Sequence, residues 1–246
     1  IHEGDEFTID GTTGNIVQGA VPMIEAEISG ELEQLLRWAD EIRRLQVWAN
    51  GDYPRDAERA RAFGAEGIGL CRTEHMFMEQ ERLPIVQRMI LASSEAERRT
   101  ALNELLPYQR ADFYGILKAM KGLPVVIRLI DPPLHEFLPS LEELLVEVTR
   151  AEALGRPAEE YAEQRRLLAA VRELHEQNPM LGLRGCRQGL RFPEIIEMQV
   201  RAILEAAVQL KKENVDARPE IMIPLVGHVN ELRRTHEILI EAAEKV

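Results

Sequence analysis

Short apolar runs that are typical of β-strands alternate along this sequence with longer amphipathic segments that are typical of helices. The clearest run, Leu123–Ile130, is almost continuously apolar and rich in β-branched residues, as expected for a strand covered on both faces in a parallel sheet. This alternation predicts an α/β fold, either a (β/α)8 TIM-type barrel or a doubly wound sheet. The predicted strands are residues 46–50, 67–71, 123–130, 180–184 and 220–226.

The segments between these strands predict helices, of which two, over residues 141–155 and 159–177, form a charged insertion. Because a closed barrel needs eight parallel strands, five strands predict an incomplete (β/α)8 TIM-type barrel with helical insertions and three βα units missing. The other predicted helices are residues 53–63, 95–120 with a break near Pro107, 193–214, and a last one from about Asn230.

The first 45 residues follow a different pattern. Phe7–Ile9 and Asn15–Val17 are short β-type runs around a turn-rich segment, which predicts a hairpin. Helical spacing of apolar residues over 29–45, with Ser29 as the N-cap, predicts a linker helix. The chain opens on Ile1, which favours a piece excised from a longer protein over a processed one. The expected units are 1–28, 29–45 and 46–246.

The composition excludes several classes of protein. With 30 Lys and Arg against 42 Asp and Glu, the formal net charge is −12, which disfavours binding to nucleic acid. No apolar run approaches the roughly 20 residues that span a bilayer. The cysteines, Cys71 and Cys186, form neither a CxxC motif nor a disulfide framework. We therefore expect a folded cytoplasmic protein without a nucleic-acid or membrane partner.

Three of the five predicted strands carry arginine at their carboxyl ends: Arg72 follows its strand, Arg128 lies late in its strand, and Arg184 follows Leu181-Gly182-Leu183, with Arg187 close by. In parallel α/β folds, ligands bind at the edge where the strands end. A guanidinium group matches carboxylate or phosphate oxygens two at a time. The three arginines therefore predict an anion-binding site. The alternative is that each arginine pairs with a carboxylate such as Glu74 or Asp131.

Asp131 follows the strand over residues 123–130 and opens a loop that contains two prolines. Its carboxylate is placed to orient Arg128, as supporting residues of binding sites do. The alternative is that Asp131 only caps its own loop, which is common before proline.

Other reactive side chains carry weaker signals. The pairs Glu74-His75 and His135-Glu136 lie outside any HExxH or Cys/His cluster, so no metal site is predicted from them. Cys71 and Cys186 lie on apolar runs and are expected to be inert core residues. The sequence contains neither of the glycine-rich nucleotide-binding motifs, GxGxxG and GxxxxGK[ST].

Four segments carry a family resemblance. Residues 64–77 read GAEGIGLCRTEHMF and residues 127–139 read IRLIDPPLHEFLP; the other two are 178–187 and 219–226. They resemble the pyruvate, phosphate dikinases, a branch of the phosphoenolpyruvate-utilising enzymes, over nearly the whole chain. Phosphoenolpyruvate synthase and enzyme I of the sugar phosphotransferase system share the arginines but are less similar in these segments.

The resemblance implies a transferase that interconverts ATP, phosphate and pyruvate with AMP, pyrophosphate and phosphoenolpyruvate through a phosphohistidine. It implies that residues 1–28 are the tail of the phosphohistidine domain, that 29–45 link it onward, and that 46–246 are the first part of the substrate-binding barrel. The implied substrate-binding residues are Arg72, Arg128 and Arg184.

The resemblance also places functional groups outside this sequence. The phosphorylated histidine is expected before Ile1, and the Mg²⁺ ligands and the acid cysteine are expected beyond Val246. No catalytic set is then complete within the chain, and the isolated chain is expected to be inactive. The implied partners are pyruvate or phosphoenolpyruvate, the phosphohistidine domain of the same parent chain, and a second copy in a homodimer.

Two alternatives remain open. One is phosphoenolpyruvate synthase, in which water replaces phosphate as the final phosphoryl acceptor. The other is a non-catalytic regulatory or interaction domain, in which the helices over residues 141–177 form a partner surface and the arginines are paired in salt bridges.

Overall fold

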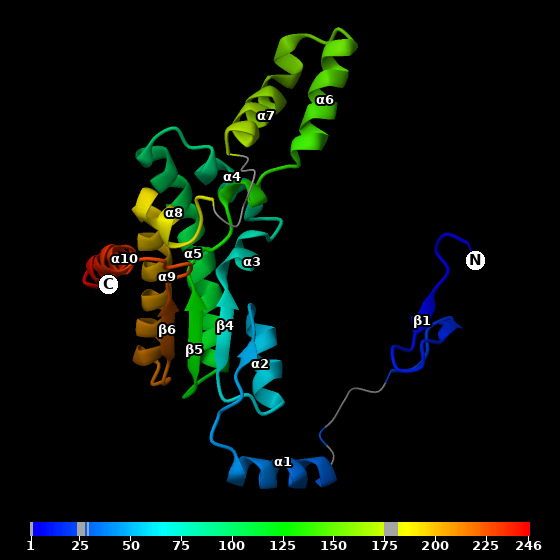
Figure 1. The fold of residues 1–246 in the computed structure, drawn as a ribbon, viewed down its shortest axis with the longest axis vertical. Coiled ribbons are helices and arrows are strands. Elements are labelled where there is room, and N and C mark those ends of the chain that lie inside the picture. Colours follow the sequence, from blue (N-terminus) through cyan, green and yellow to red (C-terminus); the bar gives the residue numbers. More distant parts are fainter. Residues whose placement is uncertain (1, 24–27, 29, 175–181) are drawn as a thin grey trace. The chain divides into compact units, whose positions relative to one another are not determined.

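The computed structural model describes residues 2–23, 28, 30–174 and 182–246 (Figure 1). The chain divides into two compact units, Ile1–Leu45 and Gln46–Val246. No helix in the described part of the chain is long and apolar enough to cross a membrane.

The first unit contains a hairpin and a helix. Strands β1 (Phe7–Ile9) and β2 (Ile16–Gln18) pair antiparallel, which confirms the predicted hairpin. Asp10 closes the turn by accepting hydrogen bonds from the Thr12 amide, at 2.9 Å, and from the Thr13 hydroxyl, at 2.5 Å. Helix α1 (Gly30–Ile42) confirms that a helix lies within the predicted range 29–45, and it contains no buried residue. The expected N-cap, residue 29, lies outside the described residues.

The second unit is built on a parallel sheet of four strands in the order β3-β4-β5-β6. Figure 1 shows β4, β5 and β6 side by side with their arrows directed to the same edge. This arrangement confirms the α/β fold, although the described strands do not close into a barrel. The strands are β3 (Ala49–Asn50), β4 (Ile68–Arg72), β5 (Pro124–Arg128) and β6 (Arg218–Met222).

The strand predicted over residues 180–184 is not part of this sheet. Residues 180 and 181 lie outside the described residues, and residues 182–184 form a bend that leads into helix α8 (Cys186–Arg191). The free edge of β5 is taken by β6, which pairs with it from Pro124 to Arg128. Because each edge of a strand pairs with one neighbour, β5 has no edge left for residues 182–184. The described residues therefore contribute four strands to the parallel sheet, not five.

Helix α5 (Glu95–Ala119) runs through Pro107, so the predicted break there is wrong. Proline removes one hydrogen bond and costs about 3 kcal/mol inside a helix. Pro107 lies on the exposed side, as does Asn103, whose carbonyl loses its partner to the proline and remains accessible to water. Buried residues on both sides of the proline, including Leu105 and Phe113, pack into one core and hold the helix together.

The core lies between the sheet and its helices. Ile68, Val125 and Ile127 are fully buried on the strands, and helices α5 and α9 (Pro193–Lys212) pack against each other. The remaining helices of this part are α2 (Pro54–Ala62), α3 (Thr73–Phe77), α4 (Leu83–Ile90) and α10 (Val229–Ala243).

The predicted helical insertion is a hairpin of α6 (Leu141–Ala153) and α7 (Ala162–Leu174), joined through a short 3-10 helix (Ala158–Tyr161). Residues 175–177 of the prediction lie outside the described residues. Buried apolar residues such as Leu144 seal the pair. Figure 1 shows the hairpin projecting beyond the edge at which the strands end.

Candidate anion-binding site

Arg72 and Arg128 occupy matching places at the ends of neighbouring strands. Each is the last residue of its strand, and the two are register partners in the β4–β5 pair. Because side chains alternate between the two faces along a strand, register partners in a parallel pair lie on the same face. The sheet thus brings two of the predicted arginines together at its carboxyl edge.

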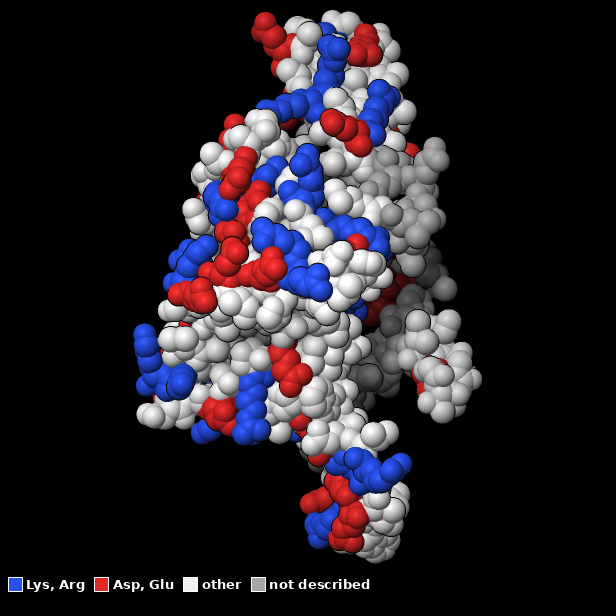
Figure 2. Space-filling view, turned by 60° about the vertical axis from the view of Figure 1, so that its left-hand side comes forward, with Lys and Arg blue, Asp and Glu red and all other residues white. Residues whose placement is uncertain are grey.

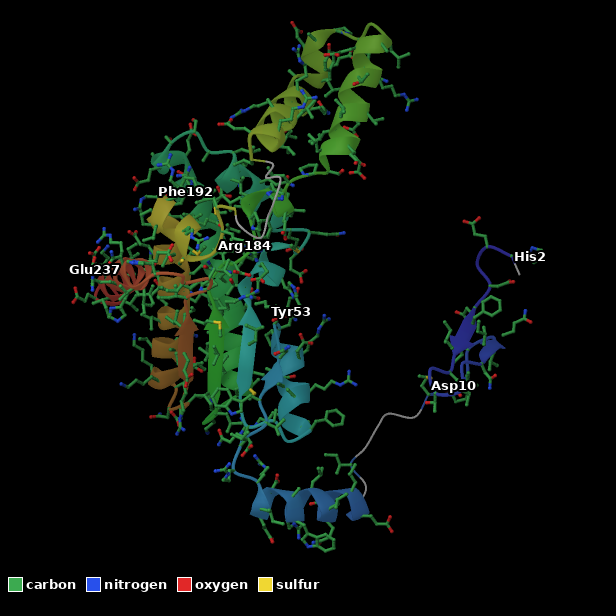
Figure 3. The ribbon with its side chains drawn as sticks, viewed as in Figure 1. His2, Asp10, Tyr53, Arg184, Phe192 and Glu237 are labelled. Atoms are coloured by element: carbon green, nitrogen blue, oxygen red, sulfur yellow. The ribbon has the colours of Figure 1, made fainter. Side chains whose placement is uncertain are left out.

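Arg184 reaches this edge from a bend rather than from the end of a strand, which corrects that part of the prediction. Its Nη2 lies 2.8 Å from Asp131 Oδ2, and its Nε donates to the Asp131 carbonyl at 3.2 Å. The Gly185 amide donates to the same carbonyl at 3.1 Å, so the backbone also ties this bend to the end of β5. Figure 3 shows Arg184 near the ends to which the arrows of β4 and β5 point.

Arg128 is held between two carboxylates. Its Nη2 is hydrogen-bonded to Glu74 Oε1, and its Nη1 lies 3.3 Å from Asp131 Oδ2. Glu74 and Asp131 are each only 6% exposed, so both ion pairs are largely shielded from solvent. Since Asp131 also contacts Arg184, its carboxylate joins two of the predicted arginines.

Arg72 is anchored by Asp52, which follows the first strand of the sheet. Asp52 Oδ2 accepts from Arg72 Nη2 at 2.6 Å and from Nε at 3.0 Å, and Oδ1 accepts from the Arg72 backbone N–H at 2.7 Å. Nδ1 of His75 lies 2.8 Å from Asp52 Oδ2. Two sets of ion pairs lie at this edge: Asp52 with Arg72, and Glu74, Arg128, Asp131 and Arg184 joined in a row. We call these six residues together the strand-end network.

The paired charges at Asp52 and Arg72 stabilise each other. Burial alone raises the pKa of Asp52, but the hydrogen bonds and charge of Arg72 outweigh it and hold that pKa below the usual value. The hydrogen bond to Asp52 raises the pKa of Arg72, against a smaller opposing effect of burial. Both groups are therefore charged at neutral pH.

Within the described part of the chain, three atoms of the strand-end network are buried without a hydrogen-bond partner: Glu74 Oε2, Arg128 Nε and Asp131 Oδ1. An unsatisfied buried polar atom costs about 1–3 kcal/mol, and most such atoms in proteins have a partner. Arg128 Nε is a donor that an anionic ligand can satisfy, whereas the two carboxylate oxygens are acceptors and need a donor such as ordered water.

The described residues give little indication of a metal site or of a reactive cysteine. They contain no group of three or more His, Cys, Asp and Glu side chains that could hold a metal ion. Cys71 and Cys186 are both buried, and burial raises the pKa of each thiol. They are placed as core residues, as the sequence suggested.

Sequence reasoning missed Asp52. A signal for it exists, because Asp52 lies two residues after the strand predicted over residues 46–50, where a ligand-facing side chain is expected. That signal is ambiguous, since an isolated aspartate before Tyr53-Pro54 also suits a turn.

These observations define a class of protein: an α/β domain with a parallel sheet and a cluster of arginines at the edge where α/β folds bind anionic ligands. The family model of the PEP-utilising enzymes, PEP-binding domain, matches residues 26–246. The chain belongs to this family, which confirms the resemblance found in the sequence.

Relatives with high identity carry the name pyruvate, phosphate dikinase. The chain is 52% identical to the dikinase of Entamoeba histolytica over 242 residues, which are 98% of this chain and 27% of that protein. It is 53% identical to that of Rhizobium meliloti over 228 residues, with 92% and 24% covered. For Clostridium symbiosum the identity is 47% over 245 residues, with 99% and 27% covered. The chain thus spans about a quarter of the length of these relatives.

Proposed function

We propose that this chain supplies the arginine side of the pyruvate and phosphoenolpyruvate site of a pyruvate, phosphate dikinase. The observation that carries the proposal is the strand-end network, in which Arg72, Arg128 and Arg184 meet at the carboxyl edge of the sheet. Membership of a PEP-binding family and identity of about 50% to named dikinases support the assignment of substrate.

The chemistry of the ligand suits this arrangement. Phosphoenolpyruvate carries a phosphate and a carboxylate, and guanidinium groups bind both with paired N–H donors. During phosphoryl transfer, negative charge spreads over the phosphoryl oxygens and the enolate, and fixed cations lower the energy of that state. In this proposal the arginines bind and orient the substrate, and Asp131 keeps Arg128 and Arg184 in place.

The wider proposal concerns the longer protein. Residues 1–28 would be the tail of its phosphohistidine domain, 29–45 its linker helix, and 46–246 the first part of a (β/α)8 TIM-type barrel. The full reaction would interconvert ATP, phosphate and pyruvate with AMP, pyrophosphate and phosphoenolpyruvate, with Mg²⁺ held by residues outside this chain. We further propose a homodimer in the cytoplasm, although a similar dikinase of Oryza sativa is named chloroplastic.

Calorimetric titration of the chain with phosphoenolpyruvate tests the site. We expect binding by the wild type and a loss of about tenfold or more in affinity for Arg128→Ala. Arg110→Ala is the matched control, because Arg110 pairs with Glu205 on an exposed helical surface. If the wild type binds no phosphoenolpyruvate, the paired arginines favour the non-catalytic interaction domain.

A second experiment separates the dikinase from phosphoenolpyruvate synthase. The isolated chain should form no AMP or pyrophosphate from ATP, phosphate and pyruvate. The full-length protein should form pyrophosphate only when phosphate is supplied. Release of phosphate without pyrophosphate would assign it to the synthase instead.

A further inference from the structure

Asp52 differs from the other carboxylates of the strand-end network in how many of its hydrogen-bond acceptor positions are occupied. It is 4% exposed and accepts four hydrogen bonds from Arg72: one from the backbone N–H, two from Nε, which is shared between both oxygens, and one from Nη2. Nδ1 of His75 lies 2.8 Å from the same carboxylate. An ionised carboxylate offers about four lone-pair positions. Glu74 and Asp131, by contrast, each keep one buried oxygen without a partner. Asp52 therefore has its capacity filled by the protein alone.

The contacts of Asp52 fix Arg72 at both ends of the residue. One oxygen holds the backbone N–H, while the other holds Nε and Nη2 along one side of the guanidinium plane. No hydrogen bond reaches Nη1 from the residues that the structure describes, and the side chain is 35% exposed. The pairing thus leaves the outer edge of the guanidinium group, with the Nη1 donors, available to an anion.

His75 is held in the same arrangement. Its Nδ1 lies 2.8 Å from Asp52 Oδ2. The Tyr53 hydroxyl donates to the His75 carbonyl at 3.1 Å and fixes the backbone there. The imidazole therefore packs against the Asp52 carboxylate and limits its freedom to rotate away from Arg72.

We propose that Asp52 is a positioning residue of the anion site, which holds the Arg72 guanidinium with its outer N–H edge directed to the phosphate or carboxylate of the ligand. This inference rests on the proposed function, because it takes Arg72 as a ligand-binding residue. Nothing in the family match or in the names of the relatives assigns a role to Asp52.

An electrostatic role and a positioning role for Asp52 predict opposite changes in affinity for an anion. Removing a carboxylate close to an anion site lowers repulsion, so a purely electrostatic role predicts tighter binding of an anion in Asp52→Asn. A positioning role predicts weaker binding, since the amide presents an N–H to Arg72 and cannot accept all of its donors. The sign of the change in affinity therefore separates the two roles.

The experiment is calorimetric titration of the chain with phosphoenolpyruvate. We expect Asp52→Asn to weaken binding by about tenfold or more, and Asp52→Glu, which keeps the charge but moves it by one methylene, to weaken it as well. In an Arg72→Ala background, Asp52→Asn should cause no further loss, because a positioning residue acts only through the group it positions. Glu194→Gln is the matched control, since Glu194 is also 4% exposed and pairs with an arginine outside the network.

A second measurement does not depend on the ligand. In arginine-labelled protein, the Nε–H resonance of Arg72, identified by its loss in Arg72→Lys, should exchange slowly in the wild type and rapidly in Asp52→Asn. Because this measurement reports the hydrogen bond between Asp52 and Arg72 directly, it shows whether a variant that binds poorly has lost that hydrogen bond.

The outcomes separate the two proposals. Unchanged or tighter binding in both Asp52 variants, with a protected Arg72 resonance in Asp52→Asn, would overturn the positioning role while leaving the anion site standing. A wild type that fails to bind phosphoenolpyruvate would remove the proposed function and this inference together. An equal loss for Glu194→Gln would show that any buried carboxylate matters, which also contradicts a specific role for Asp52.

Discussion

The strand-end network and the surface of α10 contain the same kind of ion pair in opposite environments. Asp131 and Arg184 have side chains that are 8% and 15% exposed, whereas Arg234 and Glu237 on α10 are 59% and 48% exposed. Figure 2 shows positive and negative side chains interspersed on the face that carries α10. Exposed pairs contribute about 0–1 kcal/mol, while buried pairs lose much of their attraction to desolvation. Burying charge at the strand ends is thus better explained by binding than by stability.

The largest difference is expected when one partner of each pair is removed. Asp131→Ala leaves two arginines without their shared carboxylate, and breaking a buried pair in this way costs about 3–5 kcal/mol. Urea unfolding of the chain measures the free energy of unfolding directly. A loss below about 1 kcal/mol would mean that water replaces the carboxylate, and that this buried ion pair contributes no more than the exposed pairs on α10.

Arg128→Lys tests whether the network serves binding and catalysis. Lysine keeps the charge but loses the planar fork, so in the full-length dikinase we expect turnover to fall by about a hundredfold, equivalent to about 2.7 kcal/mol. Turnover and thermal midpoint should be measured on the same preparation. A destabilised variant with normal turnover per folded molecule would mean that Arg128 only stabilises the loop that begins at Asp131.

The pH dependence of stability sharpens the comparison at Asp52. Its pKa is lower in the folded chain than in the unfolded chain, because the donors of Arg72 outweigh burial. The ionised carboxylate therefore stabilises the fold above the unfolded pKa, near 4, and this contribution is lost as the pH falls through the folded value. The difference in unfolding free energy between wild type and Asp52→Asn should shrink as the pH falls below about 4. A difference that grows on acidification would contradict the sign of this shift.

The smallest effect is expected on α10, where Figure 3 shows Glu237 on the surface. Glu237→Gln removes an exposed pair and should change the free energy of unfolding by at most about 0.5 kcal/mol. Affinity for phosphoenolpyruvate should stay the same. A loss above about 1.5 kcal/mol would show that exposure does not distinguish the two regions.

Much of the fold follows from local sequence patterns. The apolar run of β5, the helical periodicity of α6 and α7, and the turn between β1 and β2 are determined by neighbouring residues, so each was predicted close to its observed bounds. Pro107 shows the limit, because its local preference to break a helix is overruled by packing on both sides.

The sequence by itself placed Arg72 just after a strand and Arg128 late in another, since strand identity is largely a local property, and the structure makes each the last residue of its strand. Only the tertiary structure decided which carboxylates pair with these arginines. Asp52 is separated from Arg72 by 20 residues, and Asp131 from Arg184 by 53. It also decided that residues 182–184 form a bend, because β6 occupies the edge of β5. Pairing and register depend on which distant segments compete for the same edge, and no local pattern encodes that competition.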